Sequence, residues 1–233
     1  REKLGEPTEP RPDGPLIWLH AVGLGETLAL RGLIAAMAAQ SDAQFLITST
    51  TRASAQVLAQ NLPPRTRHQF LPLDAPGYLA RFLDHWRPDL SIWAEQDIWP
   101  GAVVAADARG IPLALTNARM NPESYARRRR WRGLYADLFA RFRLITAQDD
   151  APARHLQALG AKGVRVTGSL KAAAPPLSAD PQALSQAREA LVGQSPVLLA
   201  SSHHDDEFVT LSAFRALHTR PLLVIAPRDP ARG

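Results

Sequence analysis

Residues 16–26, Leu-Ile-Trp-Leu-His-Ala-Val-Gly-Leu-Gly-Glu, decide the fold class of this chain. The segment begins with a continuous apolar run that ends at His20. A continuous run, unlike an alternating one, predicts a strand that is buried on both faces. Two glycines follow the run and precede Glu26 and a helical stretch near 26–40. A strand, a glycine turn and a helix in this order are typical of a parallel sheet covered by helices.

The same alternation of short apolar runs and helical stretches continues toward the C-terminus. Strands are predicted at Gln44–Thr48, His68–Leu71, Leu90–Ala94, Leu113–Thr116, Leu144–Ala147 and Val164–Thr167. Helices are predicted near 52–60, 76–86, 99–109, 123–141 and 149–158. The short connections predict a doubly wound α/β domain over residues 16–170. Residues 1–15 carry four Pro without periodicity and are predicted to form a tail.

Residues 171–181 differ in composition from the chain on either side. They read Lys-Ala-Ala-Ala-Pro-Pro-Leu-Ser-Ala-Asp-Pro, which predicts an interdomain linker. The alternation then restarts with a helix near 181–191, a strand Val197–Ala200, a helix near 204–218 and a strand Leu222–Ala226. So short a segment cannot cover a parallel sheet. Residues 182–233 are therefore expected to be the beginning of a second Rossmann-like domain, and the chain as given is expected to be incomplete and inactive.

The composition excludes several classes of protein. With 45% hydrophobic residues the chain cannot be wholly disordered, and the absence of Cys excludes disulfides, thiolate zinc sites and a cysteine nucleophile. No apolar run approaches the ~20 residues of a membrane helix. The His spacing predicts no metal site. The net charge is +5, and the basic residues are 24 Arg and three Lys, a bias that reflects codon composition or a basic surface that meets phosphates on lipid or nucleic acid.

Glu26 is the candidate general base. Ligands of open parallel sheets bind at the carboxyl ends of the strands, and Glu26 follows such an end at a predicted helix N-terminus. The helix dipole there favours an ionised carboxylate, and glycines such as Gly25 let a backbone approach a ligand closely. The alternative is an ordinary first-turn Glu that stabilises the helix.

Two further strand ends carry charged side chains. Glu95 and Asp97 follow the strand Leu90–Ala94 and are suited to binding sugar hydroxyls, although Asp97 is equally suited to cap the helix that begins near Pro100. Arg119 follows the strand Leu113–Thr116. Its guanidinium can bind a phosphate or a carboxylate, or can pair with one of the two acids.

A basic segment with aromatic neighbours lies on the helical stretch 123–141. It consists of Arg127, Arg128, Arg129, Arg130, Trp131 and Arg132. Such a segment suits an anionic membrane surface, and it also suits RNA. The alternative is a solvated helix face without a partner.

Residues 201–207, Ser-Ser-His-His-Asp-Asp-Glu, follow the strand Val197–Ala200. Ser201 or Ser202 is expected to cap the next helix, with the acids in its first turn. A hydrolase triad lacks support, because no G-x-S-x-G turn accompanies it.

Six segments of the chain together resemble motifs of the Kdo (3-deoxy-D-manno-oct-2-ulosonic acid) transferases, in the same order and spacing. They are HAVGLGE, AEQDIWP, TNARM, ITAQDD followed by ARHLQALGAKGVRVTGSLK, ASSHHDDE and APRDP. The resemblance covers residues 16–232 and implies a GT-B-type glycosyltransferase. It implies an inverting transfer of Kdo from CMP-Kdo to a lipid A precursor in lipopolysaccharide biosynthesis. It also implies a place on the cytoplasmic face of the bacterial inner membrane, against its anionic surface, with no cofactor, metal or nucleic acid.

The resemblance also implies roles for individual residues. Glu26 matches the family's catalytic acid and would take a proton from the acceptor hydroxyl. The residues implied to bind substrate are Gly25, Glu95, Asp97, Arg119, Lys171, Ser201, His203 and Arg228. The chain departs from the family pattern at Gly23, Asp205 and Asp229, and the last of these places an anion near an anionic donor. A divergent paralogue therefore remains the alternative: one that uses another donor, or that docks on membrane or RNA through its Arg-rich helix without catalysis.

Overall fold

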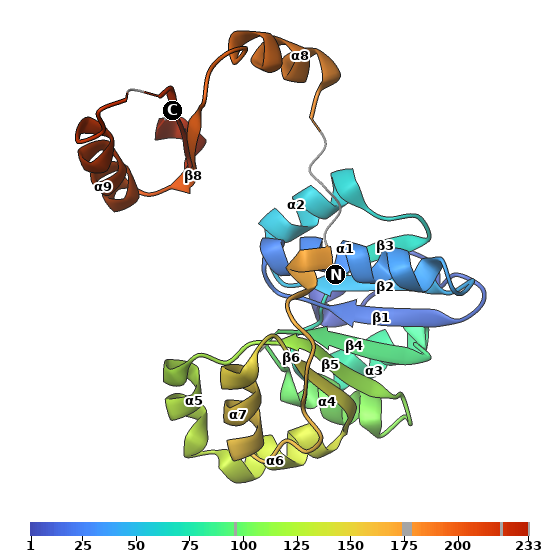
Figure 1. Cartoon of the computed structure of the whole chain (residues 1–233). Helices are drawn as coiled ribbons and strands as arrows, with labels where there is room; N and C mark the ends of the chain where they lie inside the picture. The colour runs from blue at the N-terminus through green and yellow to red at the C-terminus, as the bar shows by residue number, and fades with distance from the viewer. Residues whose placement is uncertain (96, 174–178, 220, 233) are drawn as a thin grey trace. The chain divides into compact units, whose positions relative to one another are not determined.

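A computed structural model describes residues 1–95, 97–173, 179–219 and 221–232 of the chain. The chain divides into two compact units, Arg1–Pro175 and Pro176–Gly233, and each is described by itself. Figure 1 shows the strands and helices of both.

The first unit contains a parallel sheet of seven strands in the order β3-β2-β1-β4-β5-β6-β7. The strands are β1 (Leu16–His20), β2 (Gln44–Ser49), β3 (Thr66–Phe70), β4 (Leu90–Ala94), β5 (Leu113–Ala118), β6 (Phe142–Ala147) and β7 (Arg165–Val166). The helices are α1 (Leu24–Ala38), α2 (Arg52–Asn61), α3 (Pro76–Trp86), α4 (Pro100–Asp107), α5 (Pro122–Arg129), α6 (Arg132–Ala140) and α7 (Asp150–Ala158). The predicted doubly wound α/β sheet is thus confirmed.

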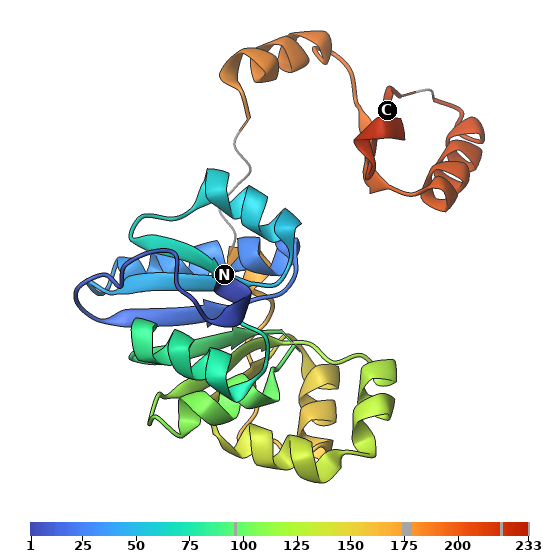
Figure 2. The same ribbon diagram turned by 180° about the vertical axis from the view of Figure 1, so that it is seen from behind.

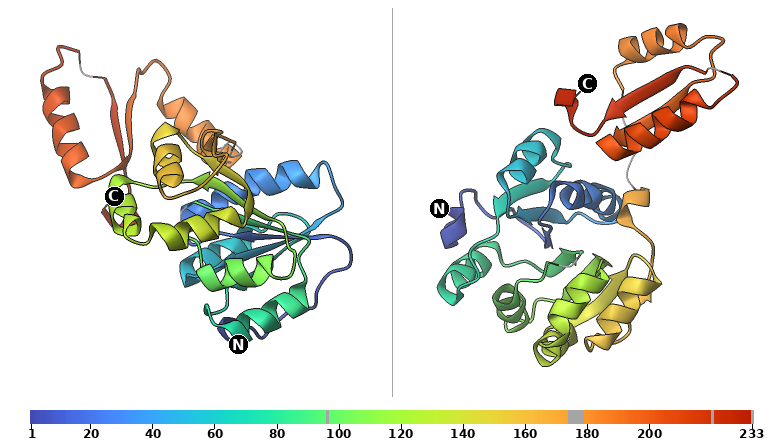
Figure 3. Two further views of the ribbon diagram at one scale, coloured as in Figure 1. Left: turned by 90° about the horizontal axis from the view of Figure 1, so that it is seen from below. Right: turned by 90° about the vertical axis from the view of Figure 1, so that its left-hand side faces the viewer.

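Helices cover both faces of this sheet. On one face, α1 and α2 pack on a cluster that includes Leu19, Phe45 and Ile47. On the other face, α3, α4, α6 and α7 pack on a cluster that includes Leu16 and Trp18. Neighbouring residues of β1 therefore face opposite helical layers, which is why the strand is a continuous apolar run. Figures 2 and 3 show the two layers from other sides.

The direction of chain winding reverses between β1 and β4, which are neighbours in the sheet but not in the sequence. From β1 the chain proceeds outward to β2 and β3, then returns to β4 and proceeds the other way. The loops that follow β1 and β4 consequently diverge to opposite faces. In open α/β sheets, such a divergence forms a crevice at the carboxyl edge, which is where these sheets bind ligands.

Three predicted elements differ from the structure. The helix predicted over 123–141 is two helices, α5 and α6, which are separated at Arg130 and Trp131. The strand predicted at Val164–Thr167 is shorter, because only Arg165–Val166 pairs with β6. The predicted linker 171–181 begins with a short 3-10 helix, η2 (Leu170–Ala173), which contacts α1. Residues 174–178 of that linker lie outside the described residues.

Residues 1–15 are attached to the first unit, so a free tail is the wrong description. A 3-10 helix, η1 (Glu2–Leu4), begins the segment, and the Glu2 carboxylate accepts a hydrogen bond from the backbone N–H of Phe70 at 2.8 Å. Arg11 donates from Nε to the carbonyl of Trp86, also at 2.8 Å. These polar contacts fix the segment without the apolar periodicity that a sequence pattern can reveal.

The second unit contains α8 (Pro181–Ala190), β8 (Val197–Ser202), α9 (His204–Arg215), β9 (Leu223–Pro227) and η3 (Pro230–Arg232). Strands β8 and β9 form a parallel pair. Apolar side chains of this unit are exposed, among them Leu198 at 64%, Phe208 at 70% and Val209 at 66%. The unit by itself therefore leaves much of its apolar surface uncovered. Within the described residues of both units, no helix is long and apolar enough to cross a membrane.

Candidate functional site

The acidic side chains predicted from the sequence meet at the crevice between β1 and β4. Glu26 lies in the first turn of α1, after β1, while Glu95 and Asp97 follow β4. The charge of Glu26 acts on both of the other carboxyls. The reversal of winding between the two strands thus brings together acids that lie about seventy residues apart in the sequence.

Glu26 is held by the backbone that precedes its own helix. Its Oε2 accepts hydrogen bonds from the N–H groups of Val22 and Gly23, each at 3.1 Å. The first-turn role proposed as an alternative is therefore present, and Glu26 also lies beside Glu95. Gly25 is exposed, and a Cβ added there would meet nothing within 4 Å. The backbone at this helix start is therefore open to a ligand.

Glu95 is the most perturbed carboxyl of the site. It is buried, and its backbone lies in the left-handed region at a φ of 65°. Burial, the charge of Glu26 and a hydrogen bond with that carboxyl together raise the pKa of Glu95 to about 7. The charges of Lys171 and Arg119 oppose this shift. Near neutral pH the Glu26–Glu95 pair accordingly tends to keep one proton.

Asp97 does not cap the helix that follows it. That helix, α4, begins at Pro100, and its N–H groups at Gly101 and Ala102 donate to the carboxylate of Asp74 at 2.9 and 2.8 Å. Asp97 is half-buried instead, and burial and the charge of Glu26 raise its pKa, while the charge of Arg128 lowers it. The capping alternative is thus wrong for Asp97.

Two cationic side chains, Arg119 and Lys171, lie near the Glu26–Glu95 pair. Arg119 and Lys171 are exposed, and both lower the pKa of Glu95 through their charge. Within the part of the chain that the structure describes, no salt bridge joins Arg119 to Glu95 or Asp97. Their charge is therefore available to an anionic ligand at this edge.

Asn117 is a site residue to which sequence reasoning assigned no role. Its Nδ2 donates to Glu95 at 3.5 Å, and its Oδ1 accepts from the N–H of Leu170 at 3.0 Å. Asn117 is buried and has a φ of 54°. It links Glu95 to η2, which carries Lys171. Its position at the end of β5, inside the quoted TNARM segment, was the signal that could have indicated it.

His20 is a neutral, structural side chain at the base of the crevice. It is fully buried, and its Nδ1 lies 2.9 Å from the Thr48 hydroxyl. Burial lowers the pKa of His20 to about 3. Its ring lies 4.8 Å from that of Trp93. Among the described residues its Nε2 has no hydrogen-bond partner.

The structure distributes the basic segment over several surroundings. Arg127, Arg128, Arg130 and Trp131 line a cavity of about 400 Å³. Arg132 instead donates to the carbonyl of Ala158 at 2.9 Å, at the end of α7. Arg129 is exposed outside that cavity. The segment is therefore not one uniform solvated face.

The residues predicted for the donor side gather within the second unit. His203 and Arg228 line a cavity of about 510 Å³ with Ser202, Asp229 and Arg232, at the carboxyl ends of β8 and β9. Ser201 does not line that cavity and has a φ of 58°.

The expected serine cap of α9 is wrong. His203 is the N-cap residue, and its N–H donates to Asp206 at 2.9 Å. The Ser202 hydroxyl donates to Glu207 at 2.8 Å instead. The acids predicted for the first turn are present there as Asp205, Asp206 and Glu207.

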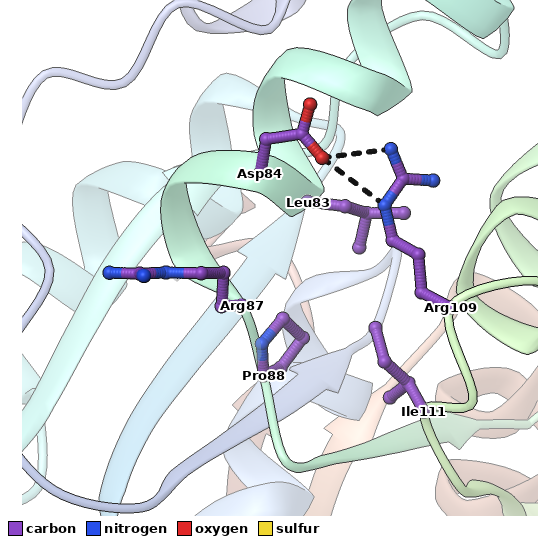
Figure 4. Close-up of a pocket in the computed structure, with 6 residues that line it drawn as sticks. All are labelled: Leu83, Asp84, Arg87, Pro88, Arg109 and Ile111. Atoms are coloured by element: carbon purple, nitrogen blue, oxygen red, sulfur yellow. Dashed lines mark hydrogen bonds and ion pairs between the residues drawn. The ribbon is translucent and has the colours of Figure 1, made fainter.

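A further cavity lies at the opposite edge of the first unit's sheet (Figure 4). It measures about 360 Å³, and Arg87, Pro88 and Ile111, which precede β4 and β5, are among its lining residues. Asp84 and Arg109 form an ion pair at its rim at 2.9 Å. Because all strands are parallel, these amino ends are remote from the acidic crevice.

Comparison with known proteins identifies the chain. Residues 1–174 match the family described as "3-Deoxy-D-manno-octulosonic-acid transferase (kdotransferase)". The chain belongs to this Kdo transferase family. A probable mitochondrial member from Arabidopsis thaliana is 34% identical in an alignment that covers all of this chain and 54% of the relative. The member from Bordetella pertussis is 34% identical in an alignment that covers 96% of this chain and 54% of the relative. The chain thus spans about half the length of these curated Kdo transferases.

Solved structures confirm the fold class. The UDP-GlcNAc 2-epimerase from Neisseria meningitidis bound to UDP-GlcNAc superposes with a TM-score of 0.59 at 15% identity, covering 91% of this chain and 64% of the epimerase. MurG from Acinetobacter baumannii gives a TM-score of 0.50 at 13% identity, covering 94% and 70%. These likenesses show the α/β fold that the Kdo transferase family shares with GT-B glycosyltransferases and epimerases.

Proposed function

We propose that the protein to which this chain belongs transfers Kdo from CMP-Kdo to a lipid A precursor in lipopolysaccharide biosynthesis. The observation that carries the proposal is the placement of Glu26 beside Glu95 at the point where the sheet reverses its winding, in a chain of the Kdo transferase family. Such a crevice is where an open α/β sheet binds substrates.

Glu26 acts as the general base in this proposal. Its Oε2 accepts hydrogen bonds from two backbone N–H groups, which fix the orientation of the carboxylate. It takes the proton of an acceptor hydroxyl as that oxygen attacks the anomeric carbon of Kdo. The bond from this carbon to CMP breaks as the new bond forms, CMP leaves with the electron pair, and the configuration inverts.

Glu95 supports the base as a neutral neighbour. With its pKa near 7, Glu95 holds a proton and can donate it toward Glu26, so that the pair carries a single negative charge. Asn117 orients Glu95 from the opposite side. When Glu26 accepts the proton of the acceptor, the Glu26–Glu95 pair holds two protons and is neutral.

The neighbouring cations bind the anionic parts of the substrates. Arg119 and Lys171 are exposed beside the acids, and the cavity with His203 and Arg228 is proposed to take the CMP of the donor. We propose that basic side chains of this kind, and no metal, stabilise the phosphate leaving group. The proposed location is the cytoplasmic face of the inner membrane, where Arg127, Arg129 and Arg130 meet anionic lipid.

The test is a transfer assay on the full-length enzyme that carries this chain, with CMP-Kdo and a lipid A precursor as substrates. Glu26→Gln should fold and lose transfer by roughly 10²–10⁴-fold, the usual worth of a general base. Glu123→Gln, which changes an exposed first-turn acid of α5, is the matched control and should retain activity. Near-normal turnover of Glu26→Gln would contradict the assignment.

The rival function is a divergent binding module without catalysis, and Asp229 favours it. This carboxylate lines the donor-side cavity next to Arg228, where an anionic donor would have to bind. Absence of transfer by the wild-type enzyme, together with retained sedimentation on vesicles of anionic lipid, would establish this rival.

A further inference from the structure

We propose that the cavity between α5 and α6 is a binding site for a phosphate monoester. Its lining residues are Ser124, Arg127, Arg128, Arg130, Trp131 and Tyr135. Three of these six are arginines, and none is acidic. The volume of about 400 Å³ lies within the range of small-molecule sites. A cavity with this lining concentrates positive charge.

Local contacts hold two of the three guanidinium groups at the cavity. Arg128 lies over the Tyr135 ring, 5.7 Å from its centroid, and its Nε donates to the Tyr135 hydroxyl at 3.2 Å. Arg127 reaches the hydroxyl of Ser124 at 3.5 Å. Ser124 is buried, and its N–H is bound by Asn121 at the helix N-terminus. Side chains that are already held lose less freedom when a ligand binds.

The chemistry of the lining selects the ligand class. A phosphate monoester carries about −1.5 to −2 charges near neutral pH and presents three acceptor oxygens. Each guanidinium presents a planar fork of N–H donors that matches two of these oxygens. A phosphodiester or a carboxylate carries a single charge and would be attracted less strongly by three guanidinium groups. The exposed Trp131 ring supplies an apolar wall for the group that the phosphate esterifies.

The cavity adjoins the acidic crevice through Arg128. This side chain lines the cavity, and its charge also acts on Asp97. A molecule held by its phosphate in the cavity can therefore extend toward Asp97 and Glu26. That the molecule is the acceptor rests on the proposed function, whereas the phosphate site itself does not.

The test is a titration of the whole chain with methyl phosphate and with dimethyl phosphate at about pH 8 and low salt. Trp131 reports binding, because it is 61% exposed whereas Trp18, Trp86 and Trp93 are buried. Methyl phosphate should bind saturably and more tightly than dimethyl phosphate. Arg128→Gln and Arg130→Gln should each weaken it by about tenfold, the change that 1.4 kcal/mol produces. Arg129→Gln is the matched control, because it removes the same charge from the same segment outside the cavity.

Vesicles of phosphatidylcholine with either phosphatidic acid or phosphatidylglycerol, matched in charge, then identify the source of the phosphate. Preference for phosphatidic acid that is lost in Arg128→Gln indicates a lipid headgroup. Methyl phosphate binding without that preference indicates a ligand outside the bilayer. Equal loss of methyl phosphate binding in Arg129→Gln and Arg128→Gln would show a diffuse basic surface and overturn the proposal. Absence of saturable methyl phosphate binding would overturn it as well. So would bound methyl phosphate that RNA displaces and that other phosphate monoesters do not.

Discussion

Replacing Glu95 by Gln should make the first unit relatively more stable as the pH rises. Glu95 has a pKa of about 7 in the fold against 4.5 as its ordinary value. Between these values the folded state binds more protons than the unfolded chain, so this group's contribution to stability falls as the pH rises. Because Gln cannot ionise, the stability of the variant does not fall with rising pH on account of this residue.

The magnitude follows from the size of the shift. At 1.36 kcal/mol per pKa unit, the shift corresponds to at most about 3 kcal/mol. Because Glu26 is only half-buried, water reaches the pair, and we expect a relative gain of about 1–2 kcal/mol from about pH 5 to about pH 8. His20 has the opposite dependence, since its lowered pKa makes the fold more stable with rising pH up to about 6.5. That term is common to both proteins and cancels in their difference.

The assay is urea unfolding of wild type and Glu95→Gln, followed by tryptophan fluorescence at several pH values. All five tryptophans of the chain lie between residues 18 and 131, so the signal reports on the first unit alone. Glu123→Gln, at an exposed acid, is the control and should show no such pH dependence. A difference in unfolding free energy between wild type and Glu95→Gln that stays constant with pH would refute the reasoning.

Three further predictions test separate features. Gly101→Ala should destabilise the protein by about 1–3 kcal/mol, because the new Cβ would lie 2.6 Å from the Asp74 carboxylate. The control is Gly77→Ala, which follows the first proline of α3 as Gly101 follows that of α4. It should be neutral or stabilising in the same urea assay. Asn117→Ala should lower the unfolding free energy by about 1–3 kcal/mol, since it leaves the N–H of Leu170 without its acceptor; an unchanged midpoint would contradict this role. In calorimetric titration, wild type should bind CMP with an affinity weaker than micromolar, and Asp229→Asn should bind it more tightly because the substitution removes an anion from the cavity; equal or weaker binding by the variant would count against the proposed donor side.

The sequence predicted the sheet because burial on both faces leaves continuous apolar runs. The runs at Leu16–His20 and Leu90–Ala94 are strands with the same bounds in the structure. Their ends carry Glu26 and Glu95, so the acids could be identified from position alone. The order of strands was not predictable from such runs, and the meeting of these two acids depends on that order.

The features that the sequence did not predict depend on contacts between segments that are distant in the sequence. Asp74 caps α4 from another loop, and Glu2 binds the end of β3 from the predicted tail. Neither contact has an apolar period or a local capping pattern. The break between α5 and α6, which shapes the arginine cavity, has neither Gly nor Pro at Arg130 and Trp131 to mark it in the sequence.

Three residues at strand ends, Glu95, Asn117 and Ser201, have a left-handed backbone, which is a conformation that can lower stability where a side chain is needed for function. Each of these residues has a φ between 54° and 65°, a conformation that glycine adopts freely and that costs most other residues about 1–2 kcal/mol. Selection for thermal stability alone would therefore be expected to enrich glycine in place of Glu95 and Ser201, whereas the Asn117 side chain itself stabilises the fold by accepting a hydrogen bond from the N–H of Leu170. Selection for activity would be expected to retain the side chains. A deep mutational scan read out once by stability and once by transfer would separate the two pressures and mark functional positions by their disagreement.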